Sequence, residues 1–275
     1  SGTIPVAMPK PALRALAGGY RRTPVMQIGA DIYCDTQLIL RKIEALHPAP
    51  SLYPAGSEGI ATALAWWADK SIFPPALGVL AATIGHTLPA EFVAERKAFG
   101  FPLEAEEASA ILHRHLQQGA AHLSWLAAML ADGRPFLLGE SPSAADLAAY
   151  CPVWMLKTRV GEKAEALLPL KALDGWYARV TEFGHGTPEE MTAADALALA
   201  AASEPASVTS PADAEPSGIP VGRQGIVRPD DTGRDEVRGT LLSADGQELV
   251  IAHENSRVGR VNLHFPRAGF DVSPA

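Results

Sequence analysis

Cysteine is scarce in this chain. The 275 residues include only two, Cys34 and Cys151, which lie far apart and match no metal-ligand spacing. A disulfide framework and a metal site are therefore not expected. The sequence is typical of a protein that folds in a reducing cytoplasm.

Long apolar runs and an excess of basic residues are also missing. No stretch of about 18 uninterrupted apolar residues is present, and the first residues show neither the basic nor the apolar part of a signal peptide. Lys and Arg number 23 against 31 Asp and Glu, which gives a net charge of -8. The sequence therefore predicts a soluble cytoplasmic protein, with neither a membrane nor a nucleic acid as its partner.

The residues that are present are enough for a large core and more than one domain, since 47% of them are hydrophobic. Composition and periodicity predict an α+β multidomain protein. The expected parts are an N-terminal α/β domain (residues 1–50), an all-helical domain (55–200), a linker (201–218) and a small β-domain (219–275). The linker is assigned because that stretch is small, polar and proline-rich.

A hairpin followed directly by a helix is predicted near the N terminus. Two apolar runs, residues 24–28 and 32–35, flank a glycine-containing turn. Asp35 or Thr36 can cap the next helix. Pro24, at the head of the first run, donates no backbone hydrogen bond. It must therefore lie at a sheet edge or hold a special turn.

Helix signals fill the middle of the chain. Leucines at helical spacing form a stripe over residues 112–130. In the sequence SPSAAD, Ser143 is placed as a helix cap and Asp146 at the third helical position, which predicts a structural capping turn. The sequence TPEE at 187–190 carries the same signature and predicts another helix start there.

The C-terminal region changes to β-favouring patterns. Alternating apolar runs after residue 219, two of them joined through Asp245-Gly246, predict four or five strands. So few residues give only a marginal core. We therefore expect this module to dock on the helical domain or on another subunit, and to cover an incomplete edge of the N-terminal sheet. The charged run at 228–236 is interpreted as a solvated loop.

The X-Pro hairpin, the capped helix, the helical segment and the SPSAAD turn occur in an order that resembles the glutathione S-transferase superfamily over roughly residues 3–200. The resemblance implies a thioredoxin-like N-terminal domain and a helical C-terminal domain. It also implies a cytoplasmic homodimer that uses glutathione as a co-substrate to conjugate or reduce a small electrophile. The β-domain is an addition to that pattern.

The resemblance also implies a binding site. Thr23 and Pro24 would contact the cysteinyl part of glutathione, while Asp35 and Thr36 would hold its γ-glutamyl end. A helix N-terminus attracts a carboxylate and an acidic side chain holds an ammonium group, so this pair suits a zwitterion. The alternatives are that the proline only preserves the turn, and that Asp35 and Thr36 are only a helix cap.

Two neighbouring arginines can supply the basic residue of the implied site. Arg22 falls where the family often carries a side chain that faces the glycyl carboxylate, and Arg21 could serve instead. No catalytic residue is assigned, because the family's Tyr, Ser or Cys belongs to a first strand and helix. Residues 3–6 can supply the second strand and residues 10–18 the second helix, which leaves none for the first pair.

Two classes of function are consistent with these residues. The first is a glutathione transferase-like enzyme, in which the site lowers the pKa of the glutathione thiol by hydrogen bonding to the thiolate. The second is a non-catalytic protein of the same fold, with the β-domain as an interaction module. Cys34, on the strand beside the site, is interpreted as a packed apolar side chain and not as a redox thiol.

Overall fold

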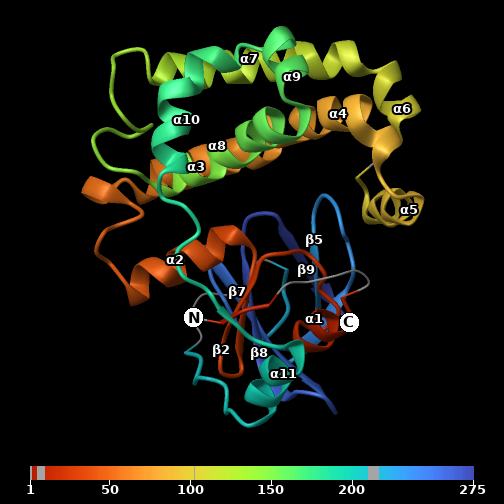
Figure 1. Ribbon diagram of the computed structural model, residues 1–275. Coiled ribbons are helices and arrows are strands. Elements are labelled where there is room, and N and C mark those ends of the chain that lie inside the picture. The colour runs from red at the N-terminus through yellow and green to blue at the C-terminus, as the bar shows by residue number, and fades with distance from the viewer. Residues whose placement is uncertain (1, 5–9, 102, 210–216) are drawn as a thin grey trace. The chain divides into compact units, whose positions relative to one another are not determined.

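The computed structural model describes residues 2–4, 10–101, 103–209 and 217–275. The chain divides into two compact units (Figure 1). Residues 1–42 and 187–275 form the first, here called the sheet unit, and residues 43–186 form the second, here called the helical unit. The helical unit is thus one continuous segment, whereas the sheet unit is assembled from both ends of the chain.

The sheet unit contains strands from both ends and a few helices. Its described strands are β1 (Gly2–Thr3), β2 (Val25–Ile28), β3 (Asp31–Cys34), β4 (Glu189–Glu190), β5 (Gln224–Pro229), β6 (Val237–Ala244), β7 (Glu248–Asn255), β8 (Gly259–Pro266) and β9 (Phe270–Pro274). Its helices are α1 (Pro11–Leu16) and α11 (Ala193–Ala201), and α2 (Thr36–Leu46) begins in it.

Seven of the described strands form one sheet in the order β2-β3-β8-β7-β6-β5-β9. β3 and β8 are parallel, and every other neighbouring pair is antiparallel. The predicted hairpin, the predicted α+β class and the predicted C-terminal strands are confirmed. The expected edge pairing is confirmed as well, because β8 covers the edge of the hairpin at β3.

The segment before α11 corrects one prediction. A helix beginning at Thr187 is wrong, since Glu189 and Glu190 form β4, which pairs in parallel with β1. The helix begins at Ala193 instead. Thr192 caps it, and its hydroxyl accepts a hydrogen bond from the Asp195 backbone N–H at 3.1 Å. Both segments carry a Thr-x-x-acid signature, but only the second is followed by a run of alanine and leucine that favours a helix.

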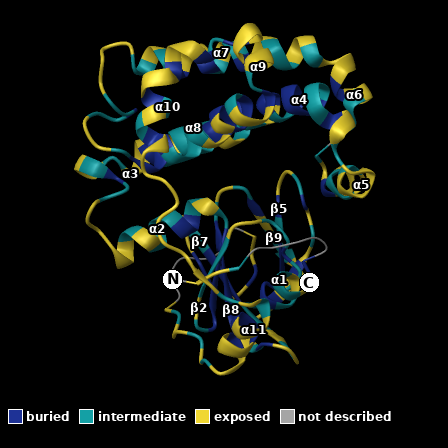
Figure 2. Cartoon of the chain, in the orientation of Figure 1, coloured by how far each residue is buried: buried dark blue, intermediate teal, exposed yellow. Residues whose placement is uncertain are grey.

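The predicted short helix near the N terminus is confirmed as α1, whereas the strand predicted over residues 3–6 falls partly on positions 5 and 6, which lie outside the described residues. α1 and α11 share one apolar core with the sheet. The core members include Leu16 and Tyr20 from the N-terminal end, Leu197 from α11, and Leu263 and Phe265 from β8. Figure 2 shows the strands around β7 and β8 as largely buried. Neither end of the chain can complete this core alone.

A buried polar cluster crosses the parallel β3–β8 pair. His264 on β8 contacts Asp31 on β3 through Nε2 at 3.0 Å and Glu248 on β7 through Nδ1 at 2.7 Å. Asn262 donates a hydrogen bond to Asp31 at 3.2 Å and another to the Ala206 carbonyl at 2.9 Å. The Ala206 backbone N–H in turn donates to Asp31 at 2.9 Å. The cluster therefore joins the hairpin, the C-terminal strands and part of the predicted linker.

The helical unit consists of helices joined by turns and loops. Its described helices are α3 (Glu58–Trp67), α4 (Phe73–Ile84), α5 (Ala90–Phe99), α6 (Ala105–Ala110), α7 (Leu112–Met129), α8 (Ala144–Met155), α9 (Glu162–Leu167) and α10 (Asp174–Thr181). α4 contacts α7 and α8, and α3 contacts α8. Leu123 and Leu126 of the predicted leucine stripe are fully buried. None of the helices in the described ranges is long and apolar enough to cross a bilayer.

The predicted capping turn of α8 is confirmed and forms a polar centre inside the helical unit. Asp146 is fully buried and accepts hydrogen bonds from the Ser143 backbone N–H at 2.9 Å and the Ser143 hydroxyl at 2.8 Å. It also accepts from the Leu137 backbone N–H and the Trp176 indole N–H, each at 2.8 Å. One carboxylate thus ties the start of α8 to the preceding loop and to α10.

Candidate functional site

The residues implied to bind glutathione meet at one end of the β2–β3 hairpin. Val25 is paired with Cys34, so Thr23–Pro24, before β2, and Asp35–Thr36, after β3, occupy the same end of the hairpin. The Thr23–Pro24 peptide bond is cis. Thr23, Pro24 and Thr36 are exposed, while Asp35 is half-buried. The four residues are therefore gathered at an accessible corner of the sheet unit.

Asp35 shapes the start of α2. Its backbone lies in the left-handed region, with φ at 74°, and its Oδ1 accepts a hydrogen bond from the Gln37 backbone N–H at 3.0 Å. Its carbonyl accepts from the Ile39 N–H at 3.0 Å. The predicted helix-capping role of Asp35 is therefore confirmed, and binding at this corner stays a prediction.

Arg21 and Arg22, next to the cis bond, are held by the loop between β5 and β6, residues 230–236. Arg21 forms an ion pair with Asp235 at 2.6 Å. Arg22 forms an ion pair with Asp231 and donates a hydrogen bond to the Thr232 carbonyl. The loop is largely exposed, as the interpretation of a solvated loop expected, and two of its carboxylates also pair with cationic side chains from the other end of the chain.

Lys10 also contacts this turn. It is 6% exposed, and its ammonium group donates a hydrogen bond to the Arg21 carbonyl at 3.0 Å and another to the Thr23 hydroxyl at 3.4 Å. A buried ammonium group is stable only with acceptors such as these. Lys10 therefore fixes the backbone that leads into the cis bond.

Two reactive groups beside this corner are buried. The Tyr20 side chain is 1% exposed, and its hydroxyl has no hydrogen-bond partner among the described residues. Burial raises the pKa of Tyr20 well above its ordinary value. Cys34 is fully buried, and burial followed by the charge of Asp35 raises the pKa of its thiol. The interpretation of Cys34 as a packed apolar side chain is confirmed, and neither group is positioned to touch a substrate.

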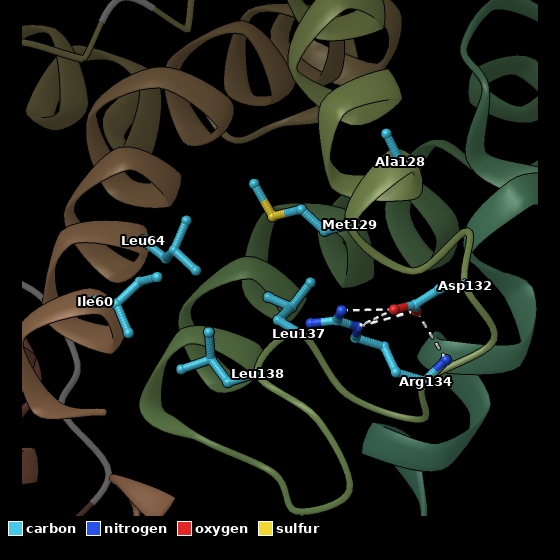
Figure 3. A pocket seen from close by; sticks show the side chains of 8 residues that line it. All are labelled: Ile60, Leu64, Ala128, Met129, Asp132, Arg134, Leu137 and Leu138. Carbon is cyan, nitrogen blue, oxygen red and sulfur yellow. Dashed lines mark hydrogen bonds and ion pairs between the residues drawn. The ribbon is translucent and has the colours of Figure 1, made fainter. Parts of the chain in front are cut away.

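A separate apolar pocket lies within the helical unit (Figure 3). It has a volume of about 370 Å³, and its walls come from α3, the end of α7 and the loop after α7. Its apolar lining residues are Ile60, Leu64, Ala128, Met129, Leu137 and Leu138. Arg134 and Asp132 add an exposed ion pair with a shortest distance of 2.5 Å. In the described ranges, no three His, Cys, Asp or Glu side chains are grouped so that they could bind a metal.

Comparison with known proteins agrees with this fold. Residues 109–179 match the family model for the glutathione S-transferase C-terminal domain. The structure is similar to the crystal structure of a GST-like protein from Pseudomonas syringae, with 32% identity, a TM-score of 0.79 and coverage of 100% of this chain and 90% of that chain. The chain therefore belongs to the glutathione S-transferase superfamily, and the predicted resemblance is confirmed.

Other solved structures share less of the chain. The β-etherase LigF from Sphingobium sp. strain SYK-6 is 16% identical, with a TM-score of 0.47 and coverage of 61% of this chain and 76% of that chain. A glutathione S-transferase from Rhodospirillum rubrum F11 is 19% identical, with a TM-score of 0.42 and coverage of 58% and 66%. No curated protein matches the chain.

Three residues at this corner were missed by sequence reasoning. Lys10, Asp231 and Asp235 contact the turn that contains Arg21 and Arg22, yet two of them lie more than 200 positions away from it. The one signal in the sequence was the charged run at 228–236, whose carboxylates required cationic partners somewhere in the fold.

Proposed function

We propose that the chain binds glutathione at the hairpin corner and acts as a glutathione transferase-like enzyme on a small electrophile. The observation that carries the proposal is the hairpin register, which brings Thr23–Pro24 and Asp35–Thr36 to one accessible end beside the N terminus of α2. Membership of the glutathione S-transferase superfamily supports it.

The proposed roles follow from the chemistry of the tripeptide. The N-terminal N–H groups and the dipole of α2 would attract the γ-glutamyl carboxylate, and Asp35 would hold the ammonium group. The Thr23 backbone would pair with the cysteinyl part, and Arg22 would meet the glycyl carboxylate. In a conjugation, the glutathione sulfur would form a bond to the electrophilic carbon. The leaving group would take its bonding electrons, and the thiol proton would pass to water.

A specific observation also favours a non-catalytic role. The Tyr20 hydroxyl and the Cys34 thiol, which lie beside the proposed site, are both buried. A binding or scaffold protein that uses its C-terminal strands as an interaction module would need neither group. An assay with glutathione and 1-chloro-2,4-dinitrobenzene separates the two functions. Turnover above the uncatalysed rate supports the enzyme, and binding without turnover supports the alternative.

The binding proposal is tested by calorimetric titration with glutathione. The double variant Asp35→Ala, Thr36→Ala should lose binding while its circular dichroism spectrum stays that of the parent protein. A matched control is Thr192→Ala, Asp195→Ala, which removes the cap of α11 with the same residue types. That control should bind as the parent does. Equal binding by the Asp35, Thr36 double variant would show that the pair is only a helix cap.

Assembly and location are part of the same proposal. We infer that the protein is a cytoplasmic homodimer, since two-fold dimers are common in the superfamily. Sedimentation should then give about twice the chain mass of 29.0 kDa. A single monomeric species at micromolar concentration would contradict it.

A further inference from the structure

The β5–β6 loop contacts the proposed ligand site through two ion pairs that differ in burial. The Arg21 and Asp235 side chains are 16% and 22% exposed and lie 2.6 Å apart. In the second pair, Arg22 is 18% exposed, while Asp231 is 38% exposed. Arg14 adds a second contact to Asp235 at 3.5 Å. Asp235 is therefore the anchored end of the loop, and Asp231 is its more accessible end.

The charges of Asp231 and Asp35 both act on one buried hydroxyl, that of Tyr20. After burial, the charges that act on the pKa of Tyr20 include those of Asp35 and Asp231, which raise it, and that of Arg22, which lowers it. The Arg22 Nε is buried and has no hydrogen-bond partner among the described residues. The Asp231 carboxylate therefore lies at the corner where the hairpin ends. It accepts a hydrogen bond there from the Arg22 guanidinium group, whose Nε donor is unused within the described ranges.

We propose that the Asp231 carboxylate occupies the carboxylate-binding position of the Arg22 guanidinium group in the free protein, and that a ligand carboxylate must displace it to bind. This inference rests on the proposed glutathione site and assigns its glycyl end to the Arg22 position. A guanidinium group forms its strongest contacts with a carboxylate in a two-pronged geometry. The Asp231 and glycyl carboxylates therefore compete for one group. Asp235, held by Arg21, keeps the loop close while Asp231 leaves.

The competition can be measured by titrating glutathione into four proteins: the parent, Asp231→Asn, Arg22→Gln and the double variant. Asp231→Asn should tighten binding by about fivefold, which is the lower end of the effects that one bound group typically has on the affinity of another. Arg22→Gln should weaken binding, and in that background Asp231→Asn should have no further effect. Glu254→Gln, on an exposed residue of β7, is the matched control for loss of one negative charge and should bind as the parent does.

Glutathione amidated at its glycyl end tests whether the affinity gain of Asp231→Asn depends on the glycyl carboxylate. Because the amide presents no carboxylate to Arg22, its affinity should be the same for the parent and for Asp231→Asn. Unchanged or weaker glutathione binding by Asp231→Asn would overturn the inference. So would an equal gain for the amide, or an Arg22→Gln variant that binds glutathione as the parent does.

A second measurement works without glutathione. Phenylglyoxal reacts with accessible guanidinium groups, and peptide mapping by mass spectrometry separates the label on Arg22 from that on Arg21. The rate at Arg22 should rise about fivefold in Asp231→Asn, in line with the expected affinity gain, and stay unchanged in Glu254→Gln. An unchanged rate in Asp231→Asn overturns the inference. If the rate rises but no variant binds glutathione, the proposed function fails, while the conclusion that Asp231 occupies the Arg22 guanidinium group is kept.

Discussion

The two units of this protein are stabilised by polar clusters of very different reach along the sequence. In the helical unit, Asp146 bonds to partners no more than 30 positions away. In the sheet unit, Asp31 and His264 are 233 positions apart, and Arg22 and Asp231 are 209 apart. The polar cluster of the helical unit joins neighbouring parts of one continuous segment, whereas the clusters of the sheet unit join the two ends of the chain. The two should therefore respond differently to the same kind of change.

The largest expected effect comes from deleting residues 201–275. The deletion removes β5 to β9, which are five of the seven strands in the described sheet, and most of the apolar core. We expect the sheet unit to lose its cooperative unfolding transition in calorimetry, while the helical unit, residues 43–186, keeps one.

A truncated protein that melts and sediments like the intact chain, scaled for mass, would contradict this expectation. Residues 219–275 would then be an independent domain. Expressing residues 219–275 alone tests that boundary from the other side, because an isolated module that gives a cooperative transition would support the division predicted from composition.

The difference in reach also explains what the sequence could predict. The capping turn at Ser143 and Asp146 and the hairpin at residues 24–35 are local, so their signals lie within a few residues of each other. The parallel pairing of β3 with β8 carries no local signal, since both strands read only as short apolar runs. The residues implied by the family were found at one corner, but Asp231 and Asp235 came from a segment more than 200 positions away.

The failure at TPEE shows a limit of local reading. Thr187 and Thr192 each precede an acidic residue by three positions, and only the second begins a helix. The success of such a signature depends on the residues immediately after it and on whether another strand is close enough to pair. β1 pairs with residues 189 and 190, and the whole helical unit, residues 43–186, lies between these two partners in the sequence.

Replacing Asp146 with alanine should be the most damaging single substitution in the helical unit. The change leaves the Leu137 N–H, the Ser143 N–H and the Trp176 indole N–H without their buried acceptor. We expect the free energy of unfolding to fall by about 3–5 kcal/mol, measured by urea denaturation. The matched control is Asp195→Ala, an exposed capping residue of α11, which should cost about 1 kcal/mol. Equal losses would remove the distinction between the two caps.

Two glycines test how well each unit tolerates an added Cβ. A Cβ at Gly239, in β6, would lie 2.4 Å from the Ala252 carbonyl oxygen, and one at Gly78, in α4, would lie 2.4 Å from the His115 ring. Backbone paired in a sheet cannot move aside, so Gly239→Ala should lower the free energy of unfolding by about 1–3 kcal/mol.

Gly78→Ala should be nearly neutral, because the half-buried imidazole can rotate and alanine favours the helix by about 1 kcal/mol over glycine. Both variants are compared with the parent by urea denaturation. A larger loss for Gly78→Ala than for Gly239→Ala would show that the helical unit is the less adaptable of the two.

The smallest effect is expected at the pocket of the helical unit. Hydrogen bonds from Arg134 lower the pKa of Asp132 to about 2. Any stabilisation from this pair is therefore present at neutral pH and is lost as the pH falls towards 2. Because both side chains are well exposed, solvent screens the pair. We expect Asp132→Asn to melt at the same temperature as the parent protein at pH 7, and a clear drop would assign the pair a structural role.

The parallel pairing of β3 with β8 also sets an order of events during synthesis. The hairpin leaves the ribosome before the helical unit, and its partner strand emerges more than 200 residues later. At about 5–20 residues per second, the edge of β3 waits roughly 10–50 seconds for β8. The helical unit emerges complete within that interval. The nascent chain therefore carries a folded helical segment together with an open strand edge that other nascent chains can reach before its own C terminus does.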